Sequence, residues 1–591
     1  MVVLGEQGEA APAPQGTGRT EEVGPAMTQC LSHSPGGWSR KWGAAVDRRR
    51  RWRAPALLAL AVTAAVPALA ATSASAASRG FGGGALQPGD LLISGSVYTG
   101  TAGLLSPGVT VLPPGCTSGC VTATADGSYP GVFNNALADG SFGITSPIFL
   151  NEVTPAGRLV RTLRVPDGTR PGVPGGSGVV TSFSSKSELA LNQSTNGQYV
   201  TFMGYATQPN MIDVSNANTP GVNDPTNPVP GSYYRVVATL GRDGRISYTE
   251  TNAYSGDNGR AAILNDSQGA NVLYTAGNAG NGSNPQPDGV ILGAGAQIMT
   301  PSDQPESAQD PGQPAPLGSF SITQLGDAAD KIGKDTNFRG LTVSGNVVYF
   351  TKGSGGNGVN TVYFVDTTGQ ACPDGVGLPE PGAALPTSPI AYDPSLLQSK
   401  GVYPYNMCVL QGFPTALKSA TSFPFGMWFA SPHTLYVADE GNGDNTYSAS
   451  SGTYTTAAAQ TTAGLQKWVF RSGSWQLAYT LTSGLNLGTP YQVPGYPAGD
   501  NAATGLPWAP ATDGLRNITG RVNPDGTVTI WAVTSTVSGG GDQGADPNKV
   551  VAITDNLGAQ TLPAGESFRT LEAARSGQVL RGVSFTPGTA G

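Results

Sequence analysis

Apolar residues in this chain come in short runs from Asp90 onward, and turns rich in Gly, Pro, Asn and Asp separate these runs. The runs favour Val, Tyr, Phe, Thr and Leu, which is the composition typical of β-strands. A helical spacing of apolar positions does not extend beyond about two turns anywhere in this region. The pattern therefore predicts an all-β protein.

A unit made of an inner strand, a tight turn and a second strand recurs along the chain. The first strands of the units begin at Glu188, Arg260, Arg339, Phe425, Arg516 and Arg581. Most units continue into a further strand pair, as at 234–248, 465–479 and 550–558. About four antiparallel strands per unit are typical of a β-propeller blade.

The sixth unit contains only its inner strand, at 581–585. The segments 91–98, 147–153 and 158–165 supply strands of the missing kind from the amino-terminal part. A blade built from both termini would close the ring and leave no free sheet edge. We therefore predict one domain over 85–590, an all-β, six-bladed β-propeller whose last blade is closed by both termini. Five or seven blades, or a pair of β-sandwiches, are the alternatives.

Several strand phrases are similar to those of known propellers. They are SELAL at 187–191, TLYVAD at 434–439, QKWV at 466–469 and LRGVSFTP at 580–587. On these phrases the chain resembles a family of secreted bacterial six-bladed β-propellers of uncharacterised function, within the NHL/TolB-like superfold. The resemblance covers nearly all of the chain after residue 77. It implies the fold, and it brings no activity and no functional residues with it.

Residues 48–77 have the order of a secretory signal peptide. Arginines crowd 48–53, an apolar run follows at 54–66, and small-residue cleavage sites stand at 68–70 and 74–76. The apolar run is shorter than the ~20 residues of a membrane anchor and is broken by Pro67. Residues 1–47 are then a disordered or over-extended N-terminus, with Met27 as an alternative start. We expect a secreted, extracellular monomer with no membrane contact after cleavage, and Sec and Tat export both remain open.

Composition limits the partners. The 591 residues include 84 Gly and 47 Pro, and only 12% are charged. Removal of residues 1–77 takes away 8 of 32 basic and 5 of 39 acidic groups, which leaves 24 basic, 34 acidic and a net charge of −10. Nucleic acid is not expected as a partner, because its binding depends on phosphate neutralisation.

Four cysteines remain after residue 77, an even number in a compartment where disulfides persist. Cys116 and Cys120 are close enough to close one loop, and Cys372 would then pair with Cys408. A zinc site made by all four cysteines is the alternative, although their spacing lacks the usual short double-knuckle pattern.

The loops divide between the two faces of the predicted disc. Turns within strand pairs are tight, whereas the connections on the opposite face hold long insertions, at 99–146, 206–231, 278–316, 371–423, 440–463, 485–512 and 536–548. Both predicted disulfides fall within these insertions. Long loops gathered on one face favour a recognition surface, here called the insertion face. Neutral, solvated loop expansions are the alternative.

The residues that begin the inner strands should surround the mouth of the central channel on the insertion face. They are Glu188, Arg260, Arg339, Phe425, Arg516 and Arg581. Guanidinium groups suit carboxylates, sulfates and phosphates, so the rim could hold an anionic ligand. Asp257, Asp335 and Asp513 precede three of the arginines by three or four residues, which favours structural ion pairs between blades instead.

Two further groups are candidates for binding. Trp508 lies in a long insertion, and it is the tryptophan best placed to offer an exposed stacking surface to a carbohydrate. Asp439, Asn442 and Asp444 lie in a glycine-rich turn whose oxygens could form part of a calcium site. Calcium is therefore the cofactor most compatible with the loops, and solvated turn residues are the alternative reading.

Histidine catalysis is hard to build on this chain. His433 is the only histidine after residue 77, and it lies in a tight turn opposite the insertions. Carboxylates such as Asp257, Asp439, Glu440 and Asp513 could reach the insertion face. We therefore predict a non-enzymatic binding or interaction module for an extracellular glycan or protein. The alternative is a calcium-dependent lactonase or hydrolase that uses carboxylates at the channel mouth.

Overall fold

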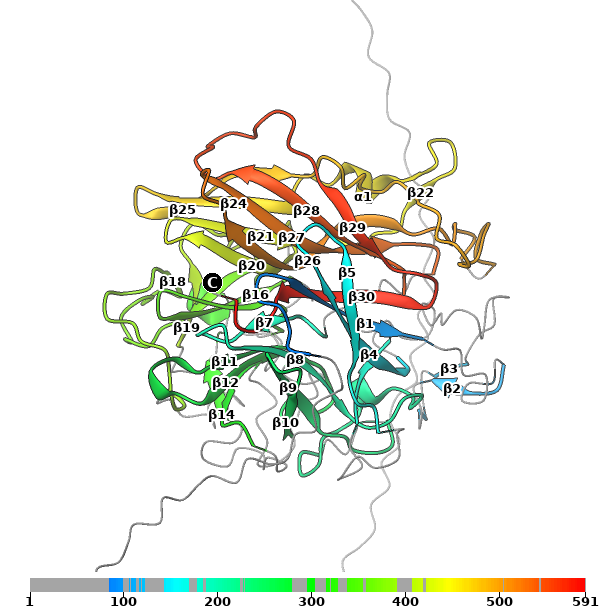
Figure 1. The fold of residues 1–591 in the computed structure, drawn as a ribbon, viewed down its shortest axis with the longest axis horizontal. Coiled ribbons are helices and arrows are strands. Elements are labelled where there is room, and N and C mark those ends of the chain that lie inside the picture. Colours follow the sequence, from blue (N-terminus) through cyan, green and yellow to red (C-terminus); the bar gives the residue numbers. More distant parts are fainter. Residues whose placement is uncertain are drawn as a thin grey trace, which may run out of the picture. The chain divides into compact units, whose positions relative to one another are not determined.

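A computed structural model confirms that the chain is all-β, with sheets in a propeller-like ring (Figure 1). It describes residues 84–589, with these segments left out: 99–105, 107, 113–115, 118–119, 123–142, 169–177, 184–187, 224–226, 228, 279–294, 303–314, 319, 321, 328–336, 354–357, 391–405, 418–420, 503 and 541–543. The predicted N-terminal extension and signal peptide lie outside the described residues. No helix among the residues described is both long and apolar enough to span a membrane.

Four sheets each hold the strands of one repeat. The first contains β11 (Gly259–Asn265), β12 (Val272–Gly277), β13 (Ala296–Met299) and β14 (Ala315–Gly318). The second contains β15 (Leu341–Ser344), β16 (Val347–Lys352), β17 (Thr361–Val365), β19 (Met407–Leu410) and β18 (Val376–Gly377). The third contains β20 (Pro424–Ser431), β21 (Thr434–Asp439), β24 (Gly464–Arg471) and β25 (Ser474–Leu481). The fourth contains β26 (Ala511–Val522), β27 (Thr527–Val537), β28 (Lys549–Asn556) and β29 (Arg569–Ala573).

The remaining long strands form one nine-stranded sheet. Its members are β10 (Ile246–Thr251), β9 (Arg235–Gly241), β8 (Tyr199–Ala206), β7 (Asn192–Gln193), β6 (Val179–Ser182), β4 (Thr145–Val153), β5 (Leu159–Arg164), β1 (Leu91–Val97) and β30 (Gln578–Phe585). Short elements lie outside these sheets, namely β2 (Val111–Leu112), β3 (Val121–Thr122), β22 (Tyr447–Ser448), β23 (Thr453–Tyr454), α1 (Thr455–Ala459) and the 3-10 turns η1 (Val214–Asn216), η2 (Ser267–Gly269) and η3 (Ile322–Leu325).

Strands from the two ends of the described chain pair directly. β1 runs antiparallel to β30, with Leu91 opposite Phe585, and β4 follows on the other side of β1 (Figure 1). β5 then pairs with β4. The predicted assembly of one four-stranded unit from both ends of the chain is therefore present.

The prediction of six blades is met only in part. Four sheets are separate blades, but β6 hydrogen-bonds to both β4 and β8. It thereby joins the strands β30-β1-β4-β5 and β7–β10 into one sheet. β6 lies between the strands predicted at 158–165 and 188–197, in a segment where no strand was predicted.

The inner strands make a closed ring of contacts. β7 contacts β11, β11 contacts β15, β15 contacts β20, β20 contacts β26, β26 contacts β30, and β30 contacts β7. Glycine permits this approach, because a Cβ at Gly426 would lie 2.5 Å from the carbonyl oxygen of Arg516. Gly340 and Gly582 face the backbone carbonyls of Phe425 and Leu189 in the same way. Three of the repeat-start residues are thus followed by a glycine for a steric reason.

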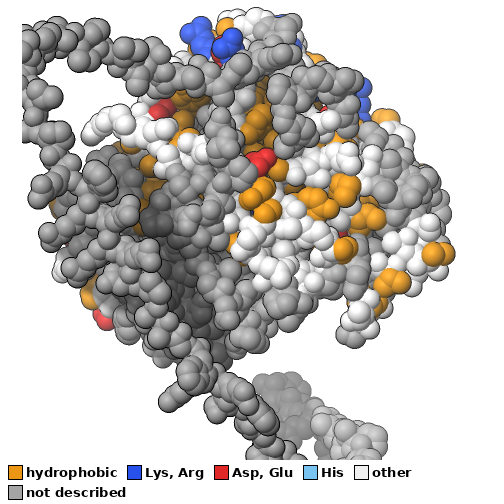
Figure 2. Space-filling view, turned by 90° about the horizontal axis from the view of Figure 1, so that it is seen from below, with side chains coloured by type: hydrophobic (Ala, Val, Ile, Leu, Met, Phe, Trp, Pro, Cys, Tyr) orange, Lys and Arg blue, Asp and Glu red, His pale blue; other side chains and the backbone are white. Residues whose placement is uncertain are grey.

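Buried apolar side chains join each sheet to the next. One cluster includes Met203 of β8 and Leu273 of β12, and the others include Tyr274 and Phe350, Phe364 and Val437, Tyr436 and Ile530, and Trp531 and Ile93. A further cluster places Leu150 of β4 with Phe202 of β8, within the nine-stranded sheet. On the face seen in Figure 2, charged side chains are few among the described residues, in keeping with the 12% of charged residues in the sequence.

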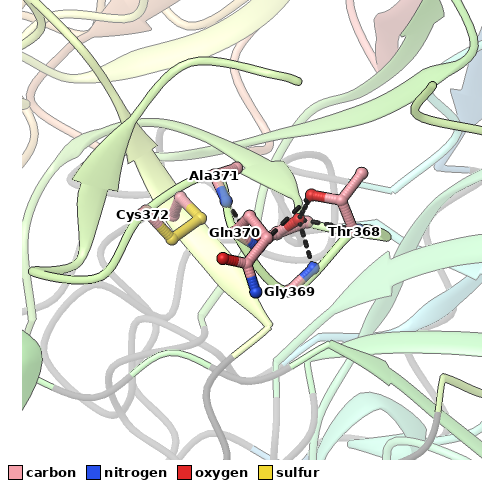
Figure 3. Close-up of a disulfide and its surroundings, with 7 residues drawn as sticks. Thr368, Gly369, Gln370, Ala371 and Cys372 are labelled. Atoms are coloured by element: carbon pink, nitrogen blue, oxygen red, sulfur yellow. Dashed lines mark hydrogen bonds between the residues drawn. A yellow bond between two sulfur atoms is a disulfide. The ribbon is translucent and has the colours of Figure 1, made fainter. Parts of the chain in front are cut away.

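Both predicted disulfides are present, Cys116–Cys120 and Cys372–Cys408. They use all four cysteines after residue 77, so the alternative zinc site is wrong. Figure 3 shows the turn that leads into Cys372. The carboxylate of Asp366 accepts hydrogen bonds from the backbone N–H groups of Thr368, Gly369 and Ala371, at 2.8 to 2.9 Å. Asp366 lies beside the two sulfur atoms, but its role is to hold this turn.

Replacing Cys372 and Cys408 together by serine should lower the free energy of unfolding by about 3 kcal/mol, because the disulfide closes a long loop in the unfolded chain. The bond joins residues 36 positions apart, whereas Cys116 and Cys120 are 4 apart. The matched pair Cys116→Ser and Cys120→Ser should cost less. Urea unfolding of both double variants measures the difference, and equal losses would contradict it.

Candidate functional site

Buried polar groups gather where chain segments enter the inner strands. Glu188, just before β7, accepts hydrogen bonds from Thr181 Oγ1 at 2.7 Å, from the Ser182 backbone N–H at 3.1 Å, and from the Tyr205 hydroxyl. Burial, followed by the charge of Glu188, raises the pKa of Tyr205 well above its usual value. Glu188 therefore anchors the start of its repeat, and Tyr205 stays protonated.

Arg235, at the start of β9, is fully buried and packs over the Tyr205 ring, with its guanidinium carbon 5.3 Å from the ring centroid. It donates to the backbone carbonyls of Tyr233, Ser215, Ala217 and Asp257 at 2.7 to 3.1 Å. Burial lowers its pKa. Its donors are used to fasten the loops before β9 and β11, which is a structural role.

Arg260, Arg339 and Arg516, together with Asp257 and Glu440, form what we call the arginine cluster. Arg516 donates from Nε to Glu440 Oε2 at 3.1 Å, and both side chains are buried. Arg260 donates from Nη1 to Asn337 Oδ1 and, at 2.8 Å, to the Phe338 carbonyl. These three arginines come from three different sheets.

The arginines of this cluster repel one another. Burial, followed by the charge of Arg339, lowers the pKa of Arg260 to about 9. Burial also lowers the pKa of Arg339, and Arg516 lowers it further, while Glu440 opposes the shift. Burial and a neighbouring guanidinium group thus both disfavour the charged forms of Arg260 and Arg339.

Among the described residues, an ion pair between sheets forms at Arg516, with a different partner from the one predicted. Arg516 pairs with Glu440, which follows β21, and not with Asp513. Asp513 instead accepts hydrogen bonds from the Gly443 backbone N–H at 2.8 Å and from Gln460 Nε2 at 2.6 Å. Asp335 lies outside the described residues.

Arg581 and Phe425, two further residues of the predicted rim, make contacts that hold the fold together. Arg581 donates from Nη2 to the backbone carbonyls of Ser182, Phe183 and Gly544, the last at 2.8 Å. It thereby holds the segment that Glu188 also anchors. Phe425 is 2% exposed, and its carbonyl accepts a hydrogen bond from Thr351 Oγ1. Its side chain belongs to the core.

Two carboxyl groups near Arg516 have raised pKa values because they are buried. The pKa of Asp513 rises to about 7 through burial, with Glu440 adding to the rise. The pKa of Asp546 rises to about 6 through burial, and hydrogen bonds from Ser538, Tyr496 and Thr536 oppose the shift. Asp513 and Asp546 both accept hydrogen bonds from other groups of the protein, so these carboxyl groups already have structural partners.

The proposed calcium ligands do not form one site. The Asp439 carboxylate is fully buried, and it accepts hydrogen bonds from Ser422, Phe423, Gly441 and Gln466 at 2.8 to 3.2 Å. Asn442 and Asp444 are exposed turn residues whose side-chain oxygens accept the backbone N–H groups of Asp444 and Thr446. The expectation of a shared calcium shell is wrong for Asp439, because protein donors surround its oxygens.

Removing metal should therefore leave the stability of the protein unchanged. Dialysis against EDTA should shift the melting temperature by less than about 1 °C, since ligand loss destabilises only when the native state binds the ligand. Differential scanning calorimetry with EDTA, and after addition of excess CaCl2, measures this. A calcium-dependent rise in the melting temperature would contradict it.

Trp508 does not offer an exposed stacking surface, and that prediction is wrong. Its side chain is 4% exposed and packs edge-on against Tyr496, with ring centroids 6.3 Å apart. The loop folds back on itself, with the Asn501 backbone N–H donating to the Leu506 carbonyl at 2.7 Å. Tyr454 also donates to the Pro507 carbonyl at 2.9 Å. The insertion therefore carries its own small core.

Sequence reasoning missed Tyr205, Arg235 and Asn278. Arg235 opens a predicted strand next to a tyrosine, which is a weak signal for a buried arginine. Tyr205 lies near the end of β8 and Asn278 directly follows β12, both without any local motif, and only their long-range neighbours give them a role. His433 is exposed in a turn after β20, as predicted, and stacks on Phe470 with ring centroids 5.9 Å apart.

Comparisons with known proteins add little to this picture. No family model and no curated protein matches the chain. Among solved structures the chain is similar to an ulvan lyase of a new polysaccharide lyase family, bound to -[GlcA(1-4)Rha3S]-, with a TM-score of 0.28 and 12% identity. The match covers 74% of this chain and 88% of that chain. At this TM-score the similarity carries no argument about fold or function.

Proposed function

We propose that the protein is a secreted six-bladed β-propeller that works as an extracellular binding module. The count of six rests on treating the nine-stranded sheet as two blades joined through β6. The closed ring of contacts among β7, β11, β15, β20, β26 and β30 supports it. The signal-like segment at 48–77 and the two disulfides support secretion, since disulfides persist outside the cell.

One observation supports a binding site in the arginine cluster. Burial, followed by repulsion from the charge of Arg339, lowers the pKa of Arg260 to about 9, and burial and the charge of Arg516 lower the pKa of Arg339. Asp257 and Glu440 offset only part of this repulsion. An anionic group bound among the guanidinium groups would relieve it, because charge-assisted hydrogen bonds to arginine are strong in a desolvated site. The ligand is then an anionic group of an extracellular glycan or protein.

A thermal-shift panel tests this function. The purified protein is heated with neutral oligosaccharides, acidic oligosaccharides, acidic peptides and simple lactones, each with and without EDTA. Acidic members should raise the melting temperature, less so in 0.5 M NaCl, and Arg260→Met should remove the shift. Arg245→Met is the matched control, because Arg245 is 56% exposed in a surface pair with Asp243. Absence of any shift with acidic members would overturn the proposal, and EDTA-sensitive lactone hydrolysis would favour the alternative enzyme.

A further inference from the structure

Arg260 presents an unused edge of its guanidinium group. Nη1 is occupied by Asn337 and Phe338. Nε is buried, and among the described residues it has no hydrogen-bond partner. The edge formed by Nε and Nη2 makes no hydrogen bond to any described residue, and this is the edge that binds a carboxylate through two parallel hydrogen bonds. A buried donor without an acceptor lowers stability unless a ligand fills it.

Asn278 presents an unused acceptor in the same neighbourhood. Its Nδ2 donates to Asp257 Oδ1 at 2.5 Å, which fixes the orientation of the amide group. Its Oδ1 is buried and receives no hydrogen bond from the described residues. A hydroxyl or N–H group of a ligand would satisfy it.

The two unused atoms, Arg260 Nε and Asn278 Oδ1, belong to residues at the same end of the β11–β12 strand pair. Gly259 of β11 is opposite Gly277 of β12, and Arg260 and Asn278 are the next residues. Asp257 interacts with both Asn278 and Arg260 at this end of the β11–β12 strand pair. It accepts a hydrogen bond from Asn278, and its charge acts on the pKa of Arg260. One compact ligand group could therefore meet the donor and the acceptor together.

We infer that the arginine cluster binds a sugar acid, through a carboxylate on the Nε–Nη2 edge of Arg260 and a ring hydroxyl on Oδ1 of Asn278. This inference rests on the proposed function and names its ligand class. Inorganic sulfate supplies acceptors and no donor. An acidic peptide carries its carboxylate on a flexible stem, away from its nearest N–H donor. A uronate ring fixes a carboxylate and several hydroxyl donors on one rigid frame, so it fits both unused atoms.

Isothermal titration calorimetry with trigalacturonate as the probe tests the inference. Trigalacturonate should bind at least tenfold more tightly than its fully methyl-esterified form, than sodium sulfate and than triglutamate. Arg260→Lys, which keeps the charge and removes the fork, should weaken binding about tenfold, and Arg245→Met should leave it unchanged. Circular dichroism and the melting temperature show whether Arg260→Lys is folded.

Each outcome decides between the two claims. Sulfate or triglutamate binding as tightly as trigalacturonate would overturn the sugar-acid inference and leave the anionic binding module standing. Binding of the neutral methyl ester with equal affinity would overturn both claims, because no anionic group would then be needed for binding. Absence of binding by all of the anions would overturn both. If Arg260→Lys does not fold, the ranking of the four probes on the unaltered protein still decides the inference.

Discussion

Replacement of Lys467 by methionine should lower the free energy of unfolding by about 4 kcal/mol, because it leaves a buried carboxylate without its counter-charge. Lys467 Nζ lies 2.9 Å from Asp555 Oδ2, and neither side chain is exposed. Methionine keeps most of the apolar stem of lysine, so the expected loss comes from the charge and its hydrogen bonds.

The network around Lys467 explains the size of this effect. Tyr436 and Tyr479 both donate to Asp555, and Lys467 also contacts the Tyr479 hydroxyl at 2.9 Å. Burial, with the charge of Asp555 adding to it, raises the pKa of Tyr436. Tyr436, Lys467 and Tyr479 lie in the sheet of β20 to β25, whereas Asp555 lies in β28. The network therefore joins two neighbouring sheets through buried polar groups.

Urea unfolding of a small set of variants separates charge from packing. Lys467→Met combined with Asp555→Asn should recover part of the loss, because no unpaired charge remains. Arg245→Met should change the free energy of unfolding by less than about 0.5 kcal/mol, since exposed ion pairs contribute little. A loss below about 1 kcal/mol in the single variant Lys467→Met would contradict this account of the network.

Raising the pH from 4 to 8 should lower the stability of the protein, and Asp513 alone should account for about 4 kcal/mol of the loss. Its pKa is raised from 3.8 to about 7 in the folded protein, first by burial. The folded state therefore holds the proton more tightly than the unfolded state. The corresponding stability is fully present below the unfolded pKa and is lost as the pH rises through the folded pKa. Asp546, with a pKa of about 6, acts in the same direction.

Comparison with Asp513→Asn isolates this contribution. The variant should show a flatter dependence of unfolding free energy on pH between 4 and 8. Asp525→Asn is the control, because Asp525 is exposed and hydrogen bonds from Thr527 lower its pKa, which is the opposite direction to Asp513. An unchanged slope in Asp513→Asn would show that Asp513 is ionised in the folded protein at pH 4.

The strands could be predicted because their signals are local. Alternating apolar residues and Gly- or Asn-containing turns mark β7, β11, β15, β20, β26 and β30, and the lone strand at 581–585 pointed to pairing with 91–98. The strand β6 escaped prediction because VVTS at 179–182 is short and has no turn partner in the sequence. Its pairing with both β4 and β8 is what changes the apparent number of sheets.

The site could be predicted only in outline. The repeat placed Arg260, Arg339 and Arg516 together, because equivalent positions of a ring face one another. The partners could not be predicted, since Glu440 reaches Arg516 from a neighbouring sheet and Asp257 meets Asn278 from the other side of the β11–β12 strand pair. Trp508 and Asp439 were misjudged for the same reason. Trp508 lies in a loop, and Asp439 ends β21 next to one, and both are buried by contacts with residues outside their own segment.

The most direct test of the binding site is a crystal structure of the protein soaked with trigalacturonate. We expect a carboxylate of the ligand on the Nε–Nη2 edge of Arg260, with a ring hydroxyl at Oδ1 of Asn278. A ligand bound elsewhere on the surface, with the Arg260 edge filled by the protein itself, would contradict it.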